Sequence, residues 1–129
     1  MSSESLHEPA EKLSPATIDR HRATVSLMEE LEAVDWYDQR IDAATDEELK
    51  AILRHNRDEE KEHAAMVLEW LRRQDPALDA QLRTYLFKDG DIMAAEAEAE
   101  GESAQANDGD GPGDGSLGIG DLRGDEVTP

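Results

Sequence analysis

The chain has 129 residues, with 32 acidic and 13 basic side chains, a formal net charge of −19 and no cysteine. This length fits one small domain, and the charge argues against partners such as nucleic acid or an anionic membrane surface. The lack of cysteine excludes disulfides, iron–sulfur clusters and thiol catalysis. Neither an apolar run of 18 residues nor a signal-like N-terminus is present, so we expect no membrane span and a cytoplasmic location.

Glycine and charge divide the chain into two parts. All nine glycines lie at or after Gly90, and residues 89–129 carry twelve acidic side chains against one basic side chain. We expect this second part to be disordered, with at most a short helix over Ala94–Ala99, because it cannot bury enough apolar surface. The predicted organisation is a flexible N-terminus, a helical domain, an acidic Gly-rich linker and a tail peptide, at residues 1–13, 14–88, 89–114 and 115–124.

Capping signals predict three helices in the helical domain. Ser14 is a candidate N-cap followed by a proline, and Thr45 with Glu48 matches a capping box. Asp75 is again followed by a proline, and a glycine follows the last helix. The predicted helices cover residues 15–43, 46–74 and 76–87. The connection between the first two is so short that they must be antiparallel neighbours.

Both long helices carry a broad apolar face, at the spacing of residues that share one side of a helix. On the first helix this face consists of Ala23, Leu27, Leu31, Val34, Tyr37 and Ile41, and on the second of Leu49, Leu53, Ala64, Val67 and Leu71. Two helices and a short third cannot enclose a core, so we predict an all-α fold in which two copies form a four-helix bundle. The alternative is a monomeric three-helix domain.

Three metal-ligating side chains lie among these apolar residues. Glu30 falls within the first apolar face, and Glu60 and His63 form a Glu-x-x-His pair on the second helix. Charged carboxylates near a core are costly unless they are paired or bind a cation. Ferritin-like di-iron bundles use one Glu from each of two helices and Glu-x-x-His from each of the other two. The chain contains half of this set, and a two-fold axis would complete it for two Fe(II) ions per dimer.

A second acidic group lies on a different face of the first predicted helix. Glu29 and Glu32 share that face with Trp36, which favours a further subunit interface where carboxylates attract cations. The alternative is an exposed acidic face with a single Trp. For Glu59 and Glu62 a solvated face is also the simpler interpretation.

Long stretches of the chain resemble the encapsulated ferritins, which are ferritin-like proteins housed in encapsulin nanocompartments. The stretches are MEELEAVDWY at residues 28–37, HNRDEEKEHA at 55–64, LEWL at 68–71 and RTYLF at 83–87. The resemblance implies two antiparallel helices with a short third, dimers that form the four-helix bundle, and an open ring of five dimers. It covers most of residues 7–88.

The resemblance also implies functional residues. Glu30, Glu60 and His63 of each subunit would form a ferroxidase centre at the dimer interface, with Tyr37 nearby. Glu29, Glu32 and Trp36 would form a metal-attraction site between dimers, with Ca²⁺ as a further candidate ligand there or at the interface. The expected activity is oxidation of Fe(II) to Fe(III) by dioxygen. An open ring has no storage cavity, so the iron mineral would collect elsewhere.

The tail contains a second resemblance. Residues 115–123, GSLGIGDLR, are similar to the encapsulin-targeting peptide of these proteins, which implies the shell protein as a partner and a location inside the nanocompartment. The docking residues would be Leu117, Gly118, Ile119, Gly120, Leu122 and Arg123. Asp121 stands where the family commonly has Ser, and its charge would weaken docking. Two other functions remain open: a non-catalytic acidic scaffold that binds Ca²⁺ or Zn²⁺, and a di-manganese or mixed-metal oxidase.

Overall fold

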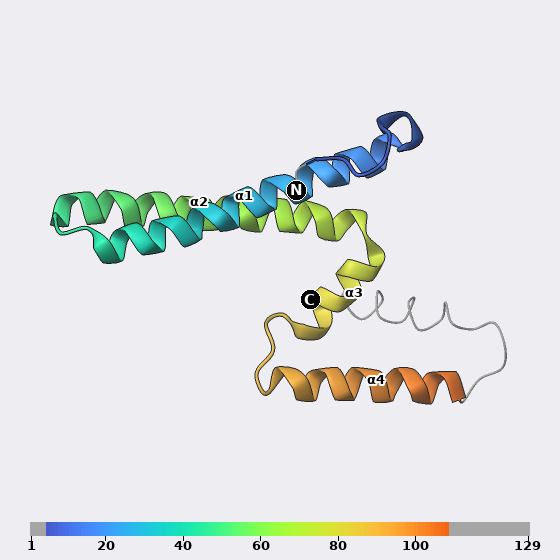
Figure 1. The fold of residues 1–129 in the computed structure, drawn as a ribbon. Coiled ribbons are helices and arrows are strands. Elements are labelled where there is room, and N and C mark those ends of the chain that lie inside the picture. The colour runs from blue at the N-terminus through green and yellow to red at the C-terminus, as the bar shows by residue number, and fades with distance from the viewer. Residues whose placement is uncertain (1–4, 109–129) are drawn as a thin grey trace. The chain divides into compact units, whose positions relative to one another are not determined.

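The described part of the chain, residues 5–108 of a computed structural model, is helical and has no strand (Figure 1). Its elements are a 3₁₀ helix η1 (Ala10–Lys12) and the helices α1 (Pro15–Ala43), α2 (Glu47–Gln74), α3 (Pro76–Tyr85) and α4 (Ile92–Asp108). The predicted all-α class, with two long helices and a short third, is confirmed. The chain divides into two compact units, one ending at Gln74 and the other beginning at Asp75.

Side-chain caps determine where the long helices begin. The Ser14 side chain accepts a hydrogen bond from the Thr17 amide at 3.1 Å, as predicted. The predicted capping box at Thr45 is replaced by a different cap, because the Asp46 carboxylate accepts from the Leu49 amide at 2.8 Å. Asp46 stands directly before the first helical residue, Glu47, and its side chain accepts from an amide of the first turn that has no partner within the helix. Helix α2 therefore starts one residue later than predicted.

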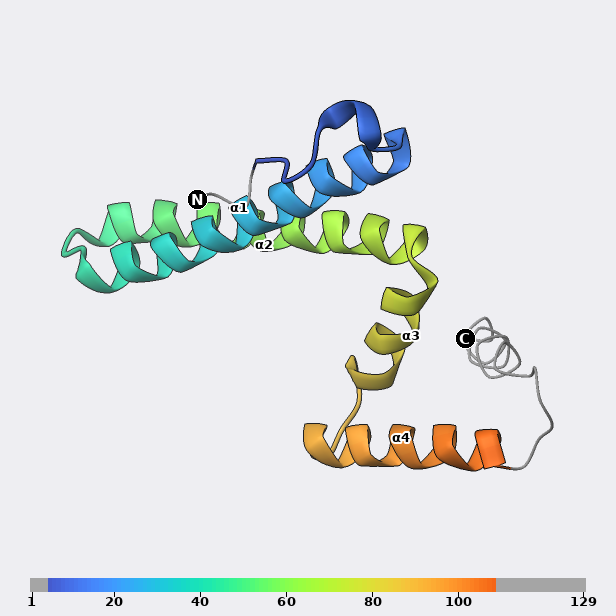
Figure 2. The same ribbon diagram turned by 45° about the vertical axis from the view of Figure 1, so that its right-hand side comes forward.

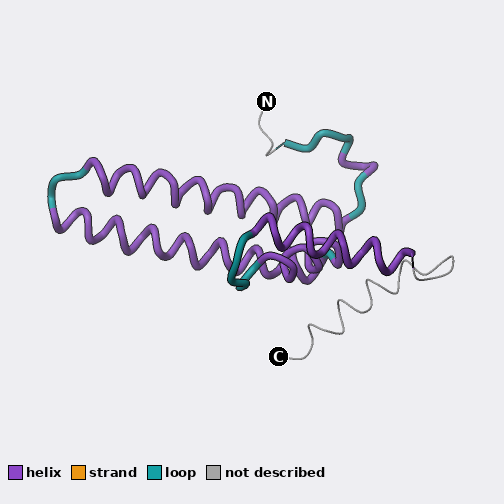
Figure 3. Tube along the Cα trace, turned by 90° about the horizontal axis from the view of Figure 1, so that it is seen from below, coloured by secondary structure: helices purple, strands orange, loops and turns teal. Residues whose placement is uncertain are grey.

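Helices α1 and α2 form an antiparallel hairpin, and both Figure 1 and Figure 3 show them side by side along their length. Their contact buries Ile41, Ala64 and Leu71, which are 7–8% exposed. The predicted apolar faces are only partly covered. Leu31 is 55% exposed and Leu49 is 45% exposed, although both belong to those faces. One helix can cover only one side of the other, which leaves apolar surface uncovered in a single hairpin.

The second unit contains α3 and α4, which contact each other (Figure 2). Asp75 caps α3 by accepting from the amides of Ala77 and Leu78, as the aspartate–proline pair predicted. Helix α4 is longer than the short stretch predicted at Ala94–Ala99 and occupies part of the segment expected to be disordered. Alanine has the strongest helix propensity, and the Asp91 side chain caps the first turn through the Ala94 amide.

Helix α3 ends in an unusual backbone conformation. Phe87 has a φ of 59° and Gly90 a φ of 97°. Glycine adopts positive φ at little cost, whereas a bulky side chain such as Phe does so only with strain. The Phe87 side chain is also fully exposed, at 102%. The last helical residue of α3 is Tyr85, so the helix ends two residues before Phe87, where its end was predicted.

Two predictions fall partly or wholly outside the described residues. The targeting peptide at 115–124 lies entirely beyond them. Of the predicted acidic linker at 89–114, residues 109–114 lie outside the described part, and side chains are described only as far as residue 102. Within residues 5–108, no helix is long and apolar enough to cross a membrane.

Candidate metal centre

The three predicted ligands come together across the hairpin. Glu30 lies in the middle of α1, and Glu60 and His63 lie one turn apart on α2. Antiparallel packing brings these positions to the same level, and the i, i+3 spacing places Glu60 and His63 on one face of α2. Their candidate ligand atoms all lie within 4.8 Å of one another. In residues 5–108 this is the one group of three or more such side chains found close enough to hold a metal ion.

The imidazole of His63 is the link between the two carboxylates. Its Nδ1 lies 3.2 Å from Glu60 Oε1 and 3.7 Å from Glu30 Oε1. The side chains of Glu30 and Glu60 are 25% exposed and that of His63 is 41% exposed, so the cluster faces partly outward from the hairpin. Two carboxylates and one imidazole form a ligand set suited to iron and similar divalent metals, and the open side leaves room for further ligands.

The pKa values of the three side chains reflect the negative charge that is concentrated in the cluster. A hydrogen bond with Glu60, followed by partial burial, raises the pKa of Glu30. The same hydrogen bond lowers the pKa of Glu60, because the carboxyl group of Glu30 acts as its donor. The pKa of His63 is raised, mainly by its hydrogen bond with Glu60. The raised pKa of Glu30 shows that its negative charge is disfavoured beside Glu60, and a bound cation would offset that charge.

Tyr37 and Trp36, which were predicted for two different sites, both lie close to the guanidinium group of Arg40. The Arg40 guanidinium lies 5.6 Å from the centroid of the Tyr37 ring and 5.9 Å from that of the Trp36 ring. These distances are within the range of a cation–π interaction. Tyr37 is half-buried and Trp36 is 48% exposed. Arg40 was not predicted from the sequence, although it lies three residues after Tyr37 and four after Trp36, which places all three on one side of the helix.

Glu29 and Glu32, the predicted metal-attraction residues, are exposed on α1. They do not form a group of three ligating side chains with any other described residue of the chain. Their exposure fits a surface away from the α1–α2 contact, as their helical spacing predicted. The assignment of Glu29, Glu32 and Trp36 to one site remains a prediction.

A second ion pair across the hairpin, between Arg57 and Asp38, was not predicted from the sequence. Arg57 donates from Nη1 to Asp38 across the hairpin at 3.0 Å and from Nε to Asp58 at 3.1 Å. These two hydrogen bonds raise the pKa of Arg57 above its usual value. Asp38 and Arg57 are 19 residues apart in sequence, so the pair could be found only once the register of the two helices was known.

Comparison with known proteins supports the same classification. The profile of the EncFtn-like family matches residues 5–89. The encapsulated ferritin-like protein of Rhodospirillum rubrum is 63% identical over 128 residues, which cover 96% of this chain and 91% of that protein. A ferritin-like protein of Thermotoga maritima is 56% identical over 90 residues, covering 70% of this chain and 79% of that protein.

Two further matches complete the comparison. The encapsulin nanocompartment cargo protein EncC of Myxococcus xanthus is 46% identical over 52 residues, which is 40% of each chain. The crystal structure of protein ne0167 from Nitrosomonas europaea has a TM-score of 0.67 and 62% identity, covering 68% of this chain and 97% of that one.

Fold, ligand cluster and comparisons define a helical protein of the ferritin-like class with a candidate acidic metal site. The chain belongs to the EncFtn-like family of encapsulated ferritin-like proteins.

Proposed function

We propose that the protein is a ferroxidase that oxidises Fe(II) to Fe(III) at a di-iron centre formed by two copies of the chain. The observation that carries this proposal is the meeting of Glu30, Glu60 and His63 within 4.8 Å on two packed helices. This cluster is half of the ligand set of a ferritin-like di-iron centre. A second copy related by a two-fold axis would supply the other half.

The uncovered apolar surface of the hairpin supports the pairing. Leu31, next to the ligand Glu30, is 55% exposed, and the ligand cluster itself is open on one side. Burying such surface is the main driving force of stable association. In the dimer, four carboxylates would neutralise two Fe(II) ions, and we infer from the family resemblance that five dimers form a ring.

The side chains have distinct roles in the proposed reaction. The carboxylates of Glu30 and Glu60 bind and bring together the two Fe(II) substrates, each of which gives one electron to dioxygen. His63 binds through a neutral nitrogen, so protons compete with iron and the activity falls in acid. Tyr37, half-buried on α1 and held by Arg40, is proposed to lie beside the centre. Fe(III) leaves the centre for storage as mineral.

Aerobic oxidation of Fe(II), followed by absorbance, tests the assignment. The variants E60A and H63A should lose most of the wild-type rate, while E59A, which removes an exposed neighbour of Glu60, should keep it. An anaerobic Fe(II) titration of the wild type should saturate near one iron per subunit. Wild-type oxidation by E60A would exclude the assignment. Tight binding of Ca²⁺, Zn²⁺ or Mn²⁺ without Fe(II) oxidation would favour a scaffold or a different metal oxidase.

We also propose that Glu29, Glu32 and Trp36 attract metal ions, Ca²⁺ included, between dimers. The support is the exposure of both carboxylates and of the Trp36 ring on α1. Replacing both carboxylates by glutamine should slow Fe(II) oxidation at low iron concentration, while the rate at saturating iron stays close to that of the wild type. An unchanged rate at low iron would exclude this role.

The iron would be stored within an encapsulin shell. This proposal rests on the similarity of residues 115–123 to the targeting peptide and on the relatives named as encapsulin cargo or encapsulated protein. Deletion of residues 115–124 should abolish co-purification with a co-expressed encapsulin shell, and D121S should strengthen it. Retention of the truncated protein by the shell would contradict the docking role of Leu117, Gly118, Ile119, Gly120, Leu122 and Arg123.

A further inference from the structure

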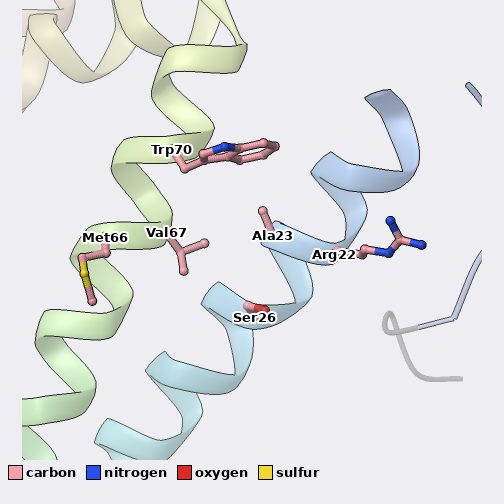
Figure 4. A pocket seen from close by; sticks show the side chains of 6 residues that line it. All are labelled: Arg22, Ala23, Ser26, Met66, Val67 and Trp70. Carbon is pink, nitrogen blue, oxygen red and sulfur yellow. The ribbon is translucent and has the colours of Figure 1, made fainter. Parts of the chain in front are cut away.

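The apolar contact between α1 and α2 is shallow. Its buried side chains are those of Ile41, Ala64 and Leu71, and no side chain in the described part of the chain is completely buried. Toward the start of α1 the contact opens into a surface depression, where Val67 of α2 points toward Ala23 of α1 (Figure 4). Apolar contacts have no preferred direction, so a shallow contact resists the sliding of one helix along the other only weakly.

A polar contact joins the same two helices with a defined direction. Arg57 on α2 donates from Nη1 to Asp38 Oδ1 on α1 at 3.0 Å and from Nε to Asp58 Oδ1 at 3.1 Å. Because Asp58 is the next residue on α2, it fixes one edge of the guanidinium on its own helix, and the other edge bonds to α1. The Arg57 side chain is only 24% exposed, so solvent screens the ion pair less than a fully exposed one.

The Arg57–Asp38 ion pair is inclined to the helix axes. The two helices are level at the ligand cluster, where Glu30 meets Glu60 and His63. Asp38 follows Glu30 by eight residues, about 12 Å along the axis, whereas Arg57 precedes Glu60 by three residues, about 4.5 Å. The Arg57 side chain therefore reaches along the axis as well as across to α1. When one helix slides, the length of an inclined contact changes directly, so this ion pair opposes sliding.

The ligand cluster is sensitive to the same sliding. Glu30 belongs to α1, while Glu60 and His63 belong to α2, and His63 Nδ1 lies 3.7 Å from Glu30 Oε1 and 3.2 Å from Glu60 Oε1. A slide of the helices leaves the Glu60–His63 distance unchanged and alters the distance of both residues to Glu30. Ligands have to be held within about 0.5 Å of their productive geometry, so even a small slide would weaken metal binding.

We propose that Asp38 and Arg57 are positioning residues of the metal centre, because their ion pair sets the axial register at which Glu30 meets Glu60 and His63. Neither residue needs to touch the metal. This inference rests on the proposed function, in which the three side chains bind one ion together, and it adds the residues that hold the two helices in the binding register.

The opposite charges of the two residues separate positioning from a simple effect of charge. Removal of the positive charge of Arg57 would by itself strengthen cation binding nearby, and removal of the negative charge of Asp38 would weaken it. Loss of the register weakens binding in both cases. Loss of a residue that orients metal ligands typically lowers metal affinity by about 10- to 100-fold, so we expect at least about tenfold weaker binding for both R57Q and D38N.

Anaerobic titration of the full-length protein with Co(II), followed by its visible d–d absorption, reports both affinity and coordination geometry. R57Q and D38N should each bind Co(II) about tenfold more weakly than the wild type, with altered absorption bands. The charge-swapped variant D38R/R57D should bind more tightly than D38R or R57D alone, because it restores an ion pair across the hairpin. Weaker binding in D38N alone, or no recovery in the swapped variant, would overturn the proposal.

Two control variants separate positioning from the loss of any ion pair and from lower stability. Arg22 pairs with Asp19 at 2.8 Å within α1, and Figure 4 shows its side chain pointing away from α2. R22Q therefore makes the same chemical change as R57Q without touching the contact between the helices. D46A removes the cap of α2 and lowers stability. Both controls should bind Co(II) like the wild type, and tenfold weaker binding in either would contradict the positioning role.

The wild-type titration distinguishes failure of this inference from failure of the proposed function. If the wild type binds neither Co(II) nor Fe(II), the proposed centre is wrong and the positioning role is wrong with it. If the wild type binds metal and both R57Q and D38N bind it equally well, only the positioning role is overturned and the proposed centre stands.

Discussion

Replacing Glu30 by glutamine removes one negative charge from the ligand cluster and keeps the length of the side chain. The ligand atoms of the cluster lie within 4.8 Å of one another. Two unit charges at that distance repel by about 1 kcal/mol in water and by about 3.5 kcal/mol at an effective dielectric constant near 20. Because Glu30 and Glu60 are 25% exposed, solvent screening places the repulsion nearer the lower figure, at about 1 to 2 kcal/mol.

The pKa of Glu30 is raised, so its charged form opposes folding at pH 8, and the metal-free E30Q protein should be more stable than the wild type by about 1 to 2 kcal/mol in free energy of unfolding. With metal the order should reverse. If the proposed centre is correct, anaerobic Fe(II) should bind the folded wild type and stabilise it by mass action, whereas E30Q lacks a ligand and should gain little. Urea unfolding with and without Fe(II) measures both effects on the same samples.

The matched control is E59Q, which removes the same formal charge from an exposed position outside the cluster. The Glu59 side chain is 50% exposed and lies 3.9 Å from His55 rather than in the cluster. E59Q should resemble the wild type both with and without Fe(II). The reasoning would be refuted if metal-free E30Q were less stable than E59Q, or if Fe(II) stabilised E30Q as much as the wild type.

Three further predictions concern the hairpin. L71A should lower the free energy of unfolding by about 2 to 4 kcal/mol, since Leu71 is 8% exposed, while L49A at a 45% exposed position should cost far less, and urea unfolding compares them. D46A should lose about 1 kcal/mol with the α2 cap, measured in the same way, and an unchanged midpoint would contradict the cap. Two arginines lower the pKa of Glu69 to about 2, so its contribution to stability is complete above its ordinary pKa of 4.5 and is lost as the pH falls toward 2. E69Q should flatten the pH dependence of the unfolding midpoint in that range, and an unchanged slope would exclude this role.

Local signals in the sequence accounted for most of the helix boundaries. Ser14 and Asp75 were identified as caps because a capping side chain followed by proline acts within one turn of helix. Asp46 was missed in favour of Thr45, since two adjacent residues can both cap and only the backbone conformation selects between them. The length of α4 was underestimated because acidic composition outweighed the alanine content in the prediction.

The candidate centre could be predicted because helical periodicity places Glu30, Glu60 and His63 on the packed sides of their helices. Their mutual distances, in contrast, depend on the axial register of the hairpin, which the separate helices do not specify. The Arg57–Asp38 pair was missed for the same reason. The strain and exposure of Phe87 follow from its backbone conformation and could not be inferred from its residue type.

The connection between α1 and α2 consists of only Ala44, Thr45 and Asp46. A turn this short lets the two helices meet as soon as they form, and chains dominated by such local contacts fold within microseconds to milliseconds. Encounters between separate chains are slower at cellular concentrations because they depend on diffusion and orientation. Newly synthesised hairpins would thus accumulate before their partners arrive, and the supply of chains would control when the proposed two-copy metal centre forms.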